Sequence, residues 1–318
     1  MNLYRTARAV ASSSGDRAID WRAAAEGAKG VTPPGSLVFE PGEREGYATD
    51  VRDARDEIGA VAGVTVVLPD QLEIQHRHHW IDANVETFQR VMAPMEEYAP
   101  RFPGIARTVN TGTMTVMLAF LGRNVLGQYD PLLLAEDPSK QHALYFVRPN
   151  IRRIARLLDL EYDRFRRWIA FHEVTHAAEF AMAPWLSGHL EDALEEGVAA
   201  LAGGSFDRQA FRELDATMTV VEGYAELLMD HAFDREYADL RRTLEAHRRG
   251  RNPVEKLIRR LLGLGLKRRQ YERGRAFFDH VVEARDLETA AVVWDGPANL
   301  PDQAELDDPA RWLRRVDP

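Results

Sequence analysis

The sequence predicts a mainly α-helical fold with a small β-sheet, an α+β architecture. Most segments place apolar residues at helical spacing, whereas only two short apolar runs have the composition of strands. One helical segment carries two histidines four residues apart, in the pentad HEVTH at 172–176. The chain shows no internal repeat that would indicate a solenoid or a propeller. We therefore expect a partly irregular lead-in over residues 1–45 and a single domain over residues 46–318.

The composition narrows the chemistry before any motif is considered. A chain of 318 residues with 45% hydrophobic content can bury a sizeable core. Its net charge of −9 argues against nucleic acid or an anionic membrane as a partner, because both require a basic face. Because the chain has no cysteine, a metal ion could be held only by histidines and carboxylates.

No segment has the pattern of a membrane anchor or of a secretion signal. The longest apolar run, MTVMLAFLG, is shorter than the roughly 18 residues that a membrane span needs. The first residues, MNLYRTARAVASSSGD, contain too short an apolar stretch for a signal peptide. We expect a soluble, cytoplasmic protein.

The elements before the pentad follow from periodicity and from turn residues. Residues 1–45 are rich in Ala, Gly, Ser and Pro, which predicts one short helix followed by loose structure. Helical spacing of apolar residues predicts a helix over 47–62 and an amphipathic helix over Trp80–Tyr98. Between them, VTVVLP at 64–69 predicts a short strand that ends at its proline.

The next elements are expected to form the centre of the molecule. TMTVMLAFLGRNVLG at 113–127 is almost wholly apolar, which predicts a helix central to the core. HALYFV at 142–147 predicts a buried strand, and 151–158 predicts a helix. The helix that carries the pentad is expected to begin near Tyr162.

The remainder of the chain is expected to be helical. WLSGHLEDALEEGVAALAGG at 185–204 predicts a helix that stops at its two glycines, and a long helix is expected over 211–232. Residues 253–284 predict two further helical segments, followed by an end rich in Pro and Asp.

The pentad predicts a metal site. Residues at i and i+4 lie one above the other on a helix, so His172 and His176 can direct their imidazoles at one zinc ion. Glu173, one position round, is then expected to act as the general base for a water molecule. About 0.05 such pentads are expected by chance in this composition, and the neighbouring residues Phe171, Val174, Thr175 and Ala177 are uncharged. The alternative is a solvated helix face that carries two unrelated histidines.

A third ligand must come from another segment. In the longer signature HExxHxxGxxH the glycine and third histidine would fall at 179 and 182, where this chain has Glu179 and Met182. Glu195 and Glu196 follow the pentad closely, whereas Glu222 lies much further along the chain. Spacing does not decide between them, because each doubling of a loop costs only about 0.6 kcal/mol.

The surroundings of the candidates favour Glu222. It has Glu226 one turn further on, where a carboxylate could orient a metal-bound histidine, whereas Glu195 and Glu196 have alanines at that position. The flanks of Glu222 are apolar, as expected of a helix that packs against the pentad helix, while LEDALEEG is acidic and indicates a surface helix or lid. The alternative for Glu222 is a buried acid paired with an arginine.

Four residues are candidates for supporting roles. Glu179 lies on roughly the same face as the histidines and could hold one imidazole, as could Glu226. Tyr224 and His231 share the helix of Glu222 and are candidate oxyanion donors, although a packing tyrosine and a surface histidine are the alternatives. All four are predicted from their positions on these two helices alone.

Other motifs carry less chemistry. His76, His78 and His79 in QHRHHW have no spacing typical of a metal site, so a solvated turn is expected there. The basic run LKRRQYERGR is expected to cover a helix and to pair with acids. The chain contains no glycine-rich phosphate loop and no GxSxG elbow.

Several stretches together resemble one family. FRRWIAFHEVTHAAEF, APWLSGHL, VEGYAELLMD and LLGLGLKRRQYERGRAFF, with WIDANVETF, VLGQYDP and VRPNI before them, are similar to a bacterial zincin-like family of zinc-dependent hydrolases or metallopeptidases. Many of its members are labelled as associated with deazaflavin coenzyme biosynthesis. The resemblance extends from about Trp80 to Val316. It implies a zincin-like core with one HExxH helix and a second, ligand-bearing helix, and it places the metal and base positions on His172, His176 and Glu173 and the second motif on Glu222 to Ala225.

These observations predict a zinc-dependent hydrolase, most simply a metallopeptidase of the gluzincin type. The ligands would be His172, His176 and Glu222, the base Glu173, and the substrate a peptide or a small amide. Two alternatives fit the same residues. One is a zinc-bearing scaffold or binding protein whose site is closed to substrate, and the other is a hydrolase of non-peptide amides.

Overall fold

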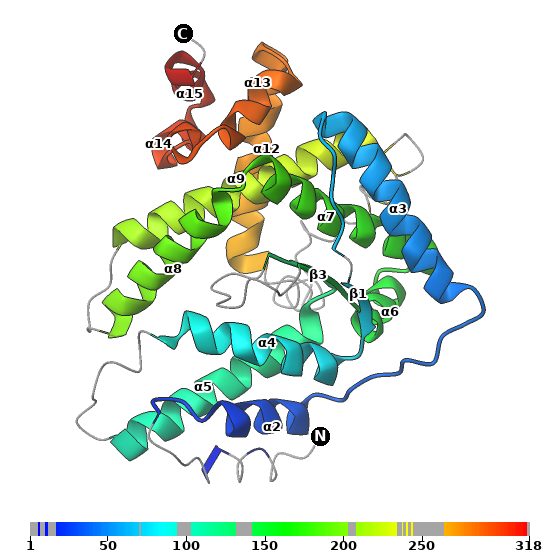
Figure 1. Cartoon of the computed structure of the whole chain (residues 1–318), viewed down its shortest axis with the longest axis vertical. Coiled ribbons are helices and arrows are strands. Elements are labelled where there is room, and N and C mark those ends of the chain that lie inside the picture. The colour runs from blue at the N-terminus through cyan, green and yellow to red at the C-terminus, as the bar shows by residue number, and fades with distance from the viewer. Residues whose placement is uncertain are drawn as a thin grey trace. The chain divides into compact units, whose positions relative to one another are not determined.

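The computed structural model describes most of the chain. The described residues are 17–69, 71–93, 103–131, 142–202, 208–233 and 264–316, together with Thr6, Val10, Ala11, Tyr237, Leu240 and Thr243. They are mainly helical with one small sheet, which confirms the predicted fold class (Figure 1). Contacts divide the chain into two compact units. The first comprises Met1–Val38, Gln71–Arg153 and Leu194–Asp207, and the second comprises Phe39–Asp70, Ile154–Ala193 and Arg208–Pro318.

The predicted lead-in over residues 1–45 and the predicted single domain over residues 46–318 stay a prediction. Two helices, α6 (Arg148–Leu157) and α8 (Leu186–Ala202), contribute residues to both units.

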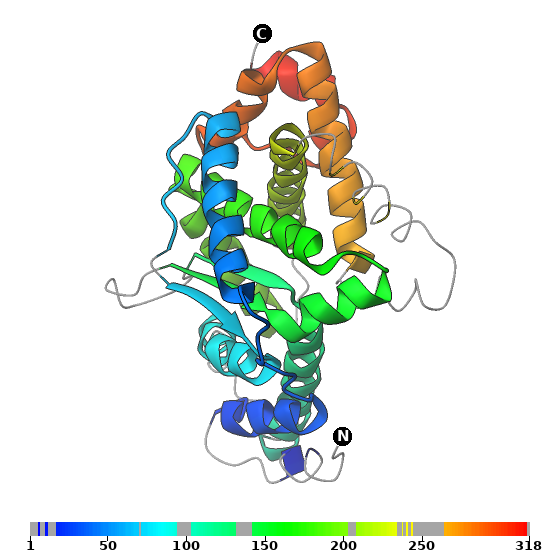
Figure 2. The same ribbon diagram turned by 90° about the vertical axis from the view of Figure 1, so that its right-hand side faces the viewer.

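The first unit contains a three-stranded mixed sheet in the order β1-β3-β2. β1 (Gln71–Gln75) pairs in parallel with β3 (Ala143–Val147), and β2 (Gly127–Asp130) pairs with β3 in antiparallel. Figure 2 shows the sheet in a second view. The predicted strand at 142–147 is confirmed, whereas the one at 64–69 is wrong, because the strand begins only after Pro69 and residues 65–69 adopt no regular structure.

Three helices accompany this sheet: α2 (Trp21–Val31), α4 (Arg77–Val91) and α5 (Pro103–Asn124). α2 and α4 pack against α5, and their core includes Trp21, Trp80, Ile81, Met114 and Leu118. The predicted central position of α5 is confirmed for one face of the helix, which packs in the core, and is wrong for the other. Its opposite face exposes three large apolar side chains, those of Ile105, Val109 and Val116.

The histidines of QHRHHW start a helix and do not form the predicted solvated turn. His76 is the N-cap of α4, and its Nδ1 accepts a hydrogen bond of 3.1 Å from the backbone N–H of His79. The rings of these two residues are stacked with centroids 3.8 Å apart. His78 lies on the first turn, with Nε2 2.6 Å from the carbonyl oxygen of Thr32. A capping imidazole satisfies a backbone donor that the helix itself leaves without a partner.

The second unit is built from four long helices. These are α3 (Glu43–Ala62), α7 (Tyr162–Met182), α9 (Arg208–Ala232) and α12 (Leu264–Ala284). α9 packs against α3, α7 and α12. Short elements close the chain: α13 (Leu287–Ala291), η3 (Val292–Trp294), η4 (Pro297–Asn299), α14 (Gln303–Asp307) and α15 (Pro309–Val316).

The basic run LKRRQYERGR lies on α12. Its described side chains behave as predicted, since Arg273 pairs with Asp307 and Arg275 with Asp230 and Asp279. The side chains of residues 264–271 lie outside the described residues. Among the described helices, none has the length and apolar character needed to cross a membrane.

The helix α7 begins and ends where its local sequence requires. Both carboxylate oxygens of Glu161 accept backbone N–H groups of the first turn, from Asp163 and Arg164. The helix stops just before Pro184, which lacks the N–H that a further turn would need. These two signals define α7 as a helix of 21 residues with the pentad in its middle.

Contacts with α3 hold the first half of α7 in place. Nε of Arg166 donates a 2.6 Å hydrogen bond to Oδ2 of Asp50, and both side chains are more than nine-tenths buried. Gly46 makes room for this guanidinium, because a Cβ atom there would lie 2.5 Å from Nη2 of Arg166. The hydroxyls of Tyr47 and Tyr162 are 2.9 Å apart next to this pair.

We expect Asp50→Ala to destabilise the protein by about 3 to 5 kcal/mol, because it removes the buried carboxylate from the buried Arg166 and leaves that charge only the exposed Asp163. The measurement is the free energy of unfolding by urea. Asp56→Ala is the matched control, since Asp56 lies on the same helix but its pair with Arg55 is exposed and is worth at most about 1 kcal/mol. Equal losses in the two variants would contradict the role assigned to the buried pair.

Candidate metal centre

Two imidazoles of α7 meet at their Nε2 atoms. His172 and His176 are one turn apart, and their Nε2 atoms are separated by 3.3 Å. Their ring planes are inclined by 76° with centroids 4.6 Å apart, so the two nitrogens face a common point. This is the arrangement expected of histidines at i and i+4 that share an ion.

Glu222 of α9 supplies an oxygen at the same point. Its Oε2 lies 3.8 Å from Nε2 of His172, and its side chain is only 2% exposed. One ligand atom from each of His172, His176 and Glu222 lies within 4.8 Å of the others. Among the described residues this is the one such group of three or more, and it excludes Glu195 and Glu196, which are exposed on α8.

The group fits a zinc ion by its spacing and by its chemistry. Two nitrogens at about 2.0 to 2.1 Å from a tetrahedral zinc are about 3.3 to 3.4 Å apart. The observed Nε2 to Nε2 separation of 3.3 Å matches this value, and the oxygen at 3.8 Å is slightly further. Two imidazoles and one carboxylate also form a ligand set that leaves a fourth position open in catalytic zinc sites.

Glu179 contacts the imidazole of His176 at Nδ1, the ring nitrogen that does not face His172. Its Oε2 lies 2.8 Å from Nδ1 of His176, and the carboxylate is fully buried. Burial raises the pKa of Glu179, and the charge of His176 opposes this only in part. Burial alone would lower the pKa of His176, but the hydrogen bond to Glu179 and the charges of Glu179, Glu222 and Glu173 raise it.

Two glycines bring α12 against the helix that carries Glu222. A Cβ atom at Gly223 would lie 2.5 Å from the carbonyl carbon of Gly274, and one at Gly274 would be closer still to the carbonyl oxygen of Thr219. The backbones of α9 and α12 therefore touch directly beside Glu222. Close contact of this kind leaves the ligand-bearing turn little freedom to move.

Comparisons with known proteins identify the family of the chain. The pattern of the zincin-like metallopeptidases matches residues 19–205 and 197–313, almost the whole chain. The chain belongs to this family. A solved structure from Chloroflexus aurantiacus, described as a "putative hydrolase with a novel fold", is similar to it over 100% of this chain and 99% of that one, with 29% identity and a TM-score of 0.71. No curated protein matches the chain. The predicted association with deazaflavin coenzyme biosynthesis stays a prediction.

The sequence analysis missed one aromatic neighbour of this zincin-like site. The indole of Trp168 stacks on the imidazole of His172, with centroids 5.6 Å apart and planes inclined by 8°. Trp168 precedes His172 by four residues, so the same helical spacing that predicted the histidine pair could have found it. The stack places an aromatic face beside the imidazole of His172.

The two candidate oxyanion donors are Tyr224, which is buried among aromatic side chains, and His231, which is exposed. Tyr224 is 1% exposed and packs edge-on against Phe278 and Trp294, and burial raises the pKa of its hydroxyl above the usual range. His231 is exposed, and its Nδ1 lies 2.9 Å from the carbonyl oxygen of Leu227 on its own helix. It is also about 13 Å along the helix axis from Glu222, so the structure does not bring it into the metal-binding group.

Glu226 remains a candidate partner for a metal ligand. It is buried on α9, one turn after Glu222, where the sequence placed it. Its role in orienting a histidine stays a prediction.

We expect Glu179→Ala to weaken zinc binding by about 10- to 100-fold, because His176 loses the carboxylate that fixes its ring. Glu179→Gln keeps an oxygen that can accept from Nδ1 and should fall between wild type and Glu179→Ala. The measurement is a competition titration against a zinc chelator, with Asp192→Ala, an exposed acid on α8, as the control. Unchanged affinity in Glu179→Ala would remove Glu179 from the site.

Proposed function

We propose that this protein is a zinc-dependent metallopeptidase of the gluzincin type. The observation that supports this most directly is the convergence of Nε2 of His172, Nε2 of His176 and Oε2 of Glu222, with Glu173 next to the first ligand. The two ligand-bearing helices come from separate parts of the sequence, as the family resemblance implies. The proposed ligands are His172, His176 and Glu222.

In the proposed reaction a bound zinc ion would activate the substrate and the water, and Glu173 would transfer the proton. A bound zinc ion would polarise the carbonyl of the scissile amide and lower the pKa of a water molecule. Glu173 takes the proton from the attacking water and passes it to the leaving amine. It is 6% exposed, so its carboxylate acts in a nearly dry environment where its charge is weakly screened.

Two further residues keep the ligands in place. Glu179 fixes the ring of His176 through Nδ1, which leaves Nε2 for the metal. Trp168 stacks on His172 and limits the rotation of that ring. Neither side chain is proposed to touch the substrate.

A peptide is the substrate class that we propose, with small amides as the second choice because the same residues would hydrolyse them. The acidic balance of the chain argues against nucleic acid and anionic membranes as partners. The family to which the chain belongs is one of metallopeptidases, which favours a peptide bond over other amides.

The test is cleavage of a mixture of synthetic peptides, followed by mass spectrometry. We expect cleavage by the zinc-loaded protein, loss of cleavage after removal of the metal by a chelator, and recovery when zinc is added back. His172→Ala should not recover. A zinc-loaded protein that cleaves neither peptides nor small amides would favour a closed, structural zinc site instead.

A further inference from the structure

A cavity lies on the side of α9 that faces away from the metal ligands. It has a volume of about 490 Å³ and is lined by His189 of α8, by residues of the first half of α9, by Pro297 and by residues 300–304. At about 100° per residue, Glu213, Ala216 and Thr217 lie roughly 120° to 180° round the helix from Glu222. The cavity is therefore separate from the zinc site, and none of the roles proposed above uses it.

The floor of the cavity is rigid. Arg315 donates hydrogen bonds to the carbonyl oxygens of Ala298 and Leu300, at 2.6 and 3.0 Å. Nε1 of Trp312 donates to the carbonyl oxygen of Asn299 at 2.7 Å. Nε2 of Gln303 ties the same segment to α9 through the carbonyl oxygen of Arg212, at 3.0 Å. A pocket held by so many hydrogen bonds is formed before any ligand arrives.

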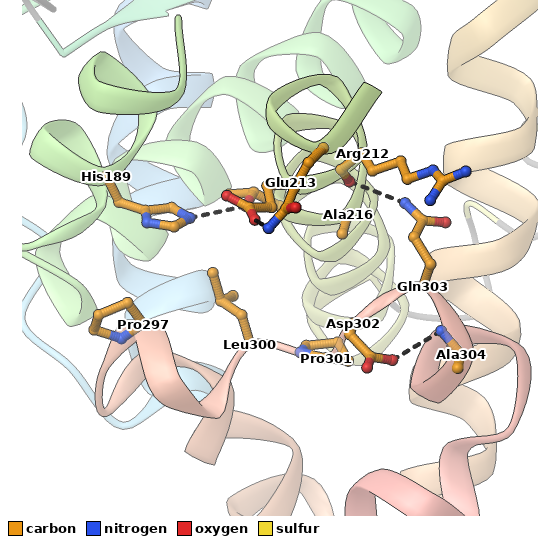
Figure 3. A pocket seen from close by; sticks show the side chains of 12 residues that line it. His189, Arg212, Glu213, Ala216, Pro297, Leu300, Pro301, Asp302, Gln303 and Ala304 are labelled. Atoms are coloured by element: carbon orange, nitrogen blue, oxygen red, sulfur yellow. Dashed lines mark hydrogen bonds between the residues drawn. The ribbon is translucent and has the colours of Figure 1, made fainter. Parts of the chain in front are cut away.

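The chemistry of the lining is apolar below and acidic at the rim. Pro297, Leu300 and Pro301 form the apolar part of the lining. Figure 3 shows the side chain of Leu300 directed into the cavity on the side of His189. Glu213 and Asp302, both exposed, supply carboxylates. Arg212 is the one cation among the lining residues, and Figure 3 shows its side chain turned away from His189.

The polar side chains at this rim are already oriented. Glu213 accepts a hydrogen bond of 3.1 Å from Gln209, and Nε2 of His189 is 3.1 Å from the hydroxyl oxygen of Thr217. Oδ1 of Asp302 caps α14 by accepting the N–H groups of Ala304 and Glu305. These bonds use neutral donors. The charge of Asp302 also raises the pKa of Arg315, so Asp302 is partly compensated and the carboxylate of Glu213 is the main charge offered to a ligand.

We propose that this cavity binds an aliphatic cation, an ammonium or guanidinium group on an apolar stem. The stem packs on Leu300 and the two prolines, and the cation lies between Glu213 and Asp302. Lysine and arginine side chains of a peptide have this chemistry, as does a free aliphatic amine. An anion is disfavoured by the two carboxylates, and a purely apolar ligand would leave them unused.

The test is an NMR titration of the full chain at about pH 8, where a histidine of ordinary pKa is neutral. The probes are acetyl-lysine methylamide, acetyl-norleucine methylamide, which has the same stem without the charge, and butylamine. We expect the lysine probe to shift the methyl signals of Leu300 and the ring signals of His189, and the norleucine probe to bind more weakly. If butylamine binds as well as the lysine probe, the cavity is a site for free amines. If butylamine binds more weakly than the lysine probe, the cavity is a site for a side chain within a peptide. Both outcomes support the proposal.

Variants locate the charge that matters. Glu213→Gln and Asp302→Asn, which keeps a capping side chain, should each weaken binding of the lysine probe about two- to fivefold, the range for an exposed ion pair. Glu283→Gln, an exposed acid on α12 outside the cavity, should have no effect. The proposal is overturned if the norleucine probe binds as tightly as the lysine probe, or if the two variants bind the lysine probe like wild type. It is also overturned if the shifts occur at Trp168 and His172 and not at Leu300 and His189. The same holds if no shift occurs at about 20 mM probe, a concentration far above weak millimolar affinities.

Discussion

Replacement of Glu222 by alanine is expected to weaken zinc binding by more than about 10²-fold, beyond the loss typical of residues that only support a ligand. The wild-type chain should hold close to one equivalent of zinc, as a single site of three protein ligands implies. Without Glu222 the ion would be left with two imidazoles from one helix. It would also lose the negative charge that compensates it in a site where only 2% of the glutamate side chain reaches solvent. His172→Ala and His176→Ala should likewise abolish stoichiometric zinc.

Metal analysis of the purified variants and a chelator competition titration measure this effect, and circular dichroism checks that each variant is folded. Glu195→Ala and Glu196→Ala are the matched controls, since both residues are exposed on α8 and should leave the zinc content unchanged. Glu222→Gln keeps a neutral oxygen ligand and should lose less affinity than Glu222→Ala. The assignment fails if Glu222→Ala retains wild-type affinity while Glu195→Ala or Glu196→Ala loses zinc.

The helices of this chain could be predicted because their signals are local. The start of α7 at Tyr162 and its end before Pro184 follow from a capping glutamate and a proline, and both are visible in the sequence. Strand pairing, in contrast, depends on partners far along the chain. The run at 64–69 has the composition of a strand, yet β3 pairs with Gln71–Gln75 instead. β2, only four residues long and of mixed composition, was not predicted at all.

The candidate metal-binding residues could also be predicted from local signals. The positions of His172 and His176 follow from helical spacing alone, and the surroundings of Glu222 in its own helix favoured it over Glu195 and Glu196. The sequence could not show that α12 contacts α9 at Gly223. Its partner Gly274 lies fifty-one residues further along the chain, and no local pattern indicates that the two glycines touch. The exposed apolar face of α5 was also invisible, since the run at 113–127 is almost wholly apolar and does not reveal which side is covered.

Glu173→Gln is expected to lower the rate of peptide cleavage by about 10²- to 10⁴-fold while it keeps the zinc and the fold. Glutamine has almost the same shape as glutamate, but its amide cannot take a proton from water at neutral pH. Because the proton is transferred in the transition state, kcat and kcat/KM should fall together while KM changes little. Glu173 follows His172 directly but is not among the three residues whose ligand atoms converge, so the metal content should be that of wild type.

The measurement is steady-state cleavage of a peptide that the wild-type protein hydrolyses, with zinc content determined on the same samples. Glu195→Gln, an exposed acid outside the metal-binding group, is the matched control and should cleave at the wild-type rate. Loss of zinc in Glu173→Gln would mean that Glu173 supports the metal site itself. Full activity in a zinc-loaded Glu173→Gln variant would exclude Glu173 as the base and would require another group to accept the proton.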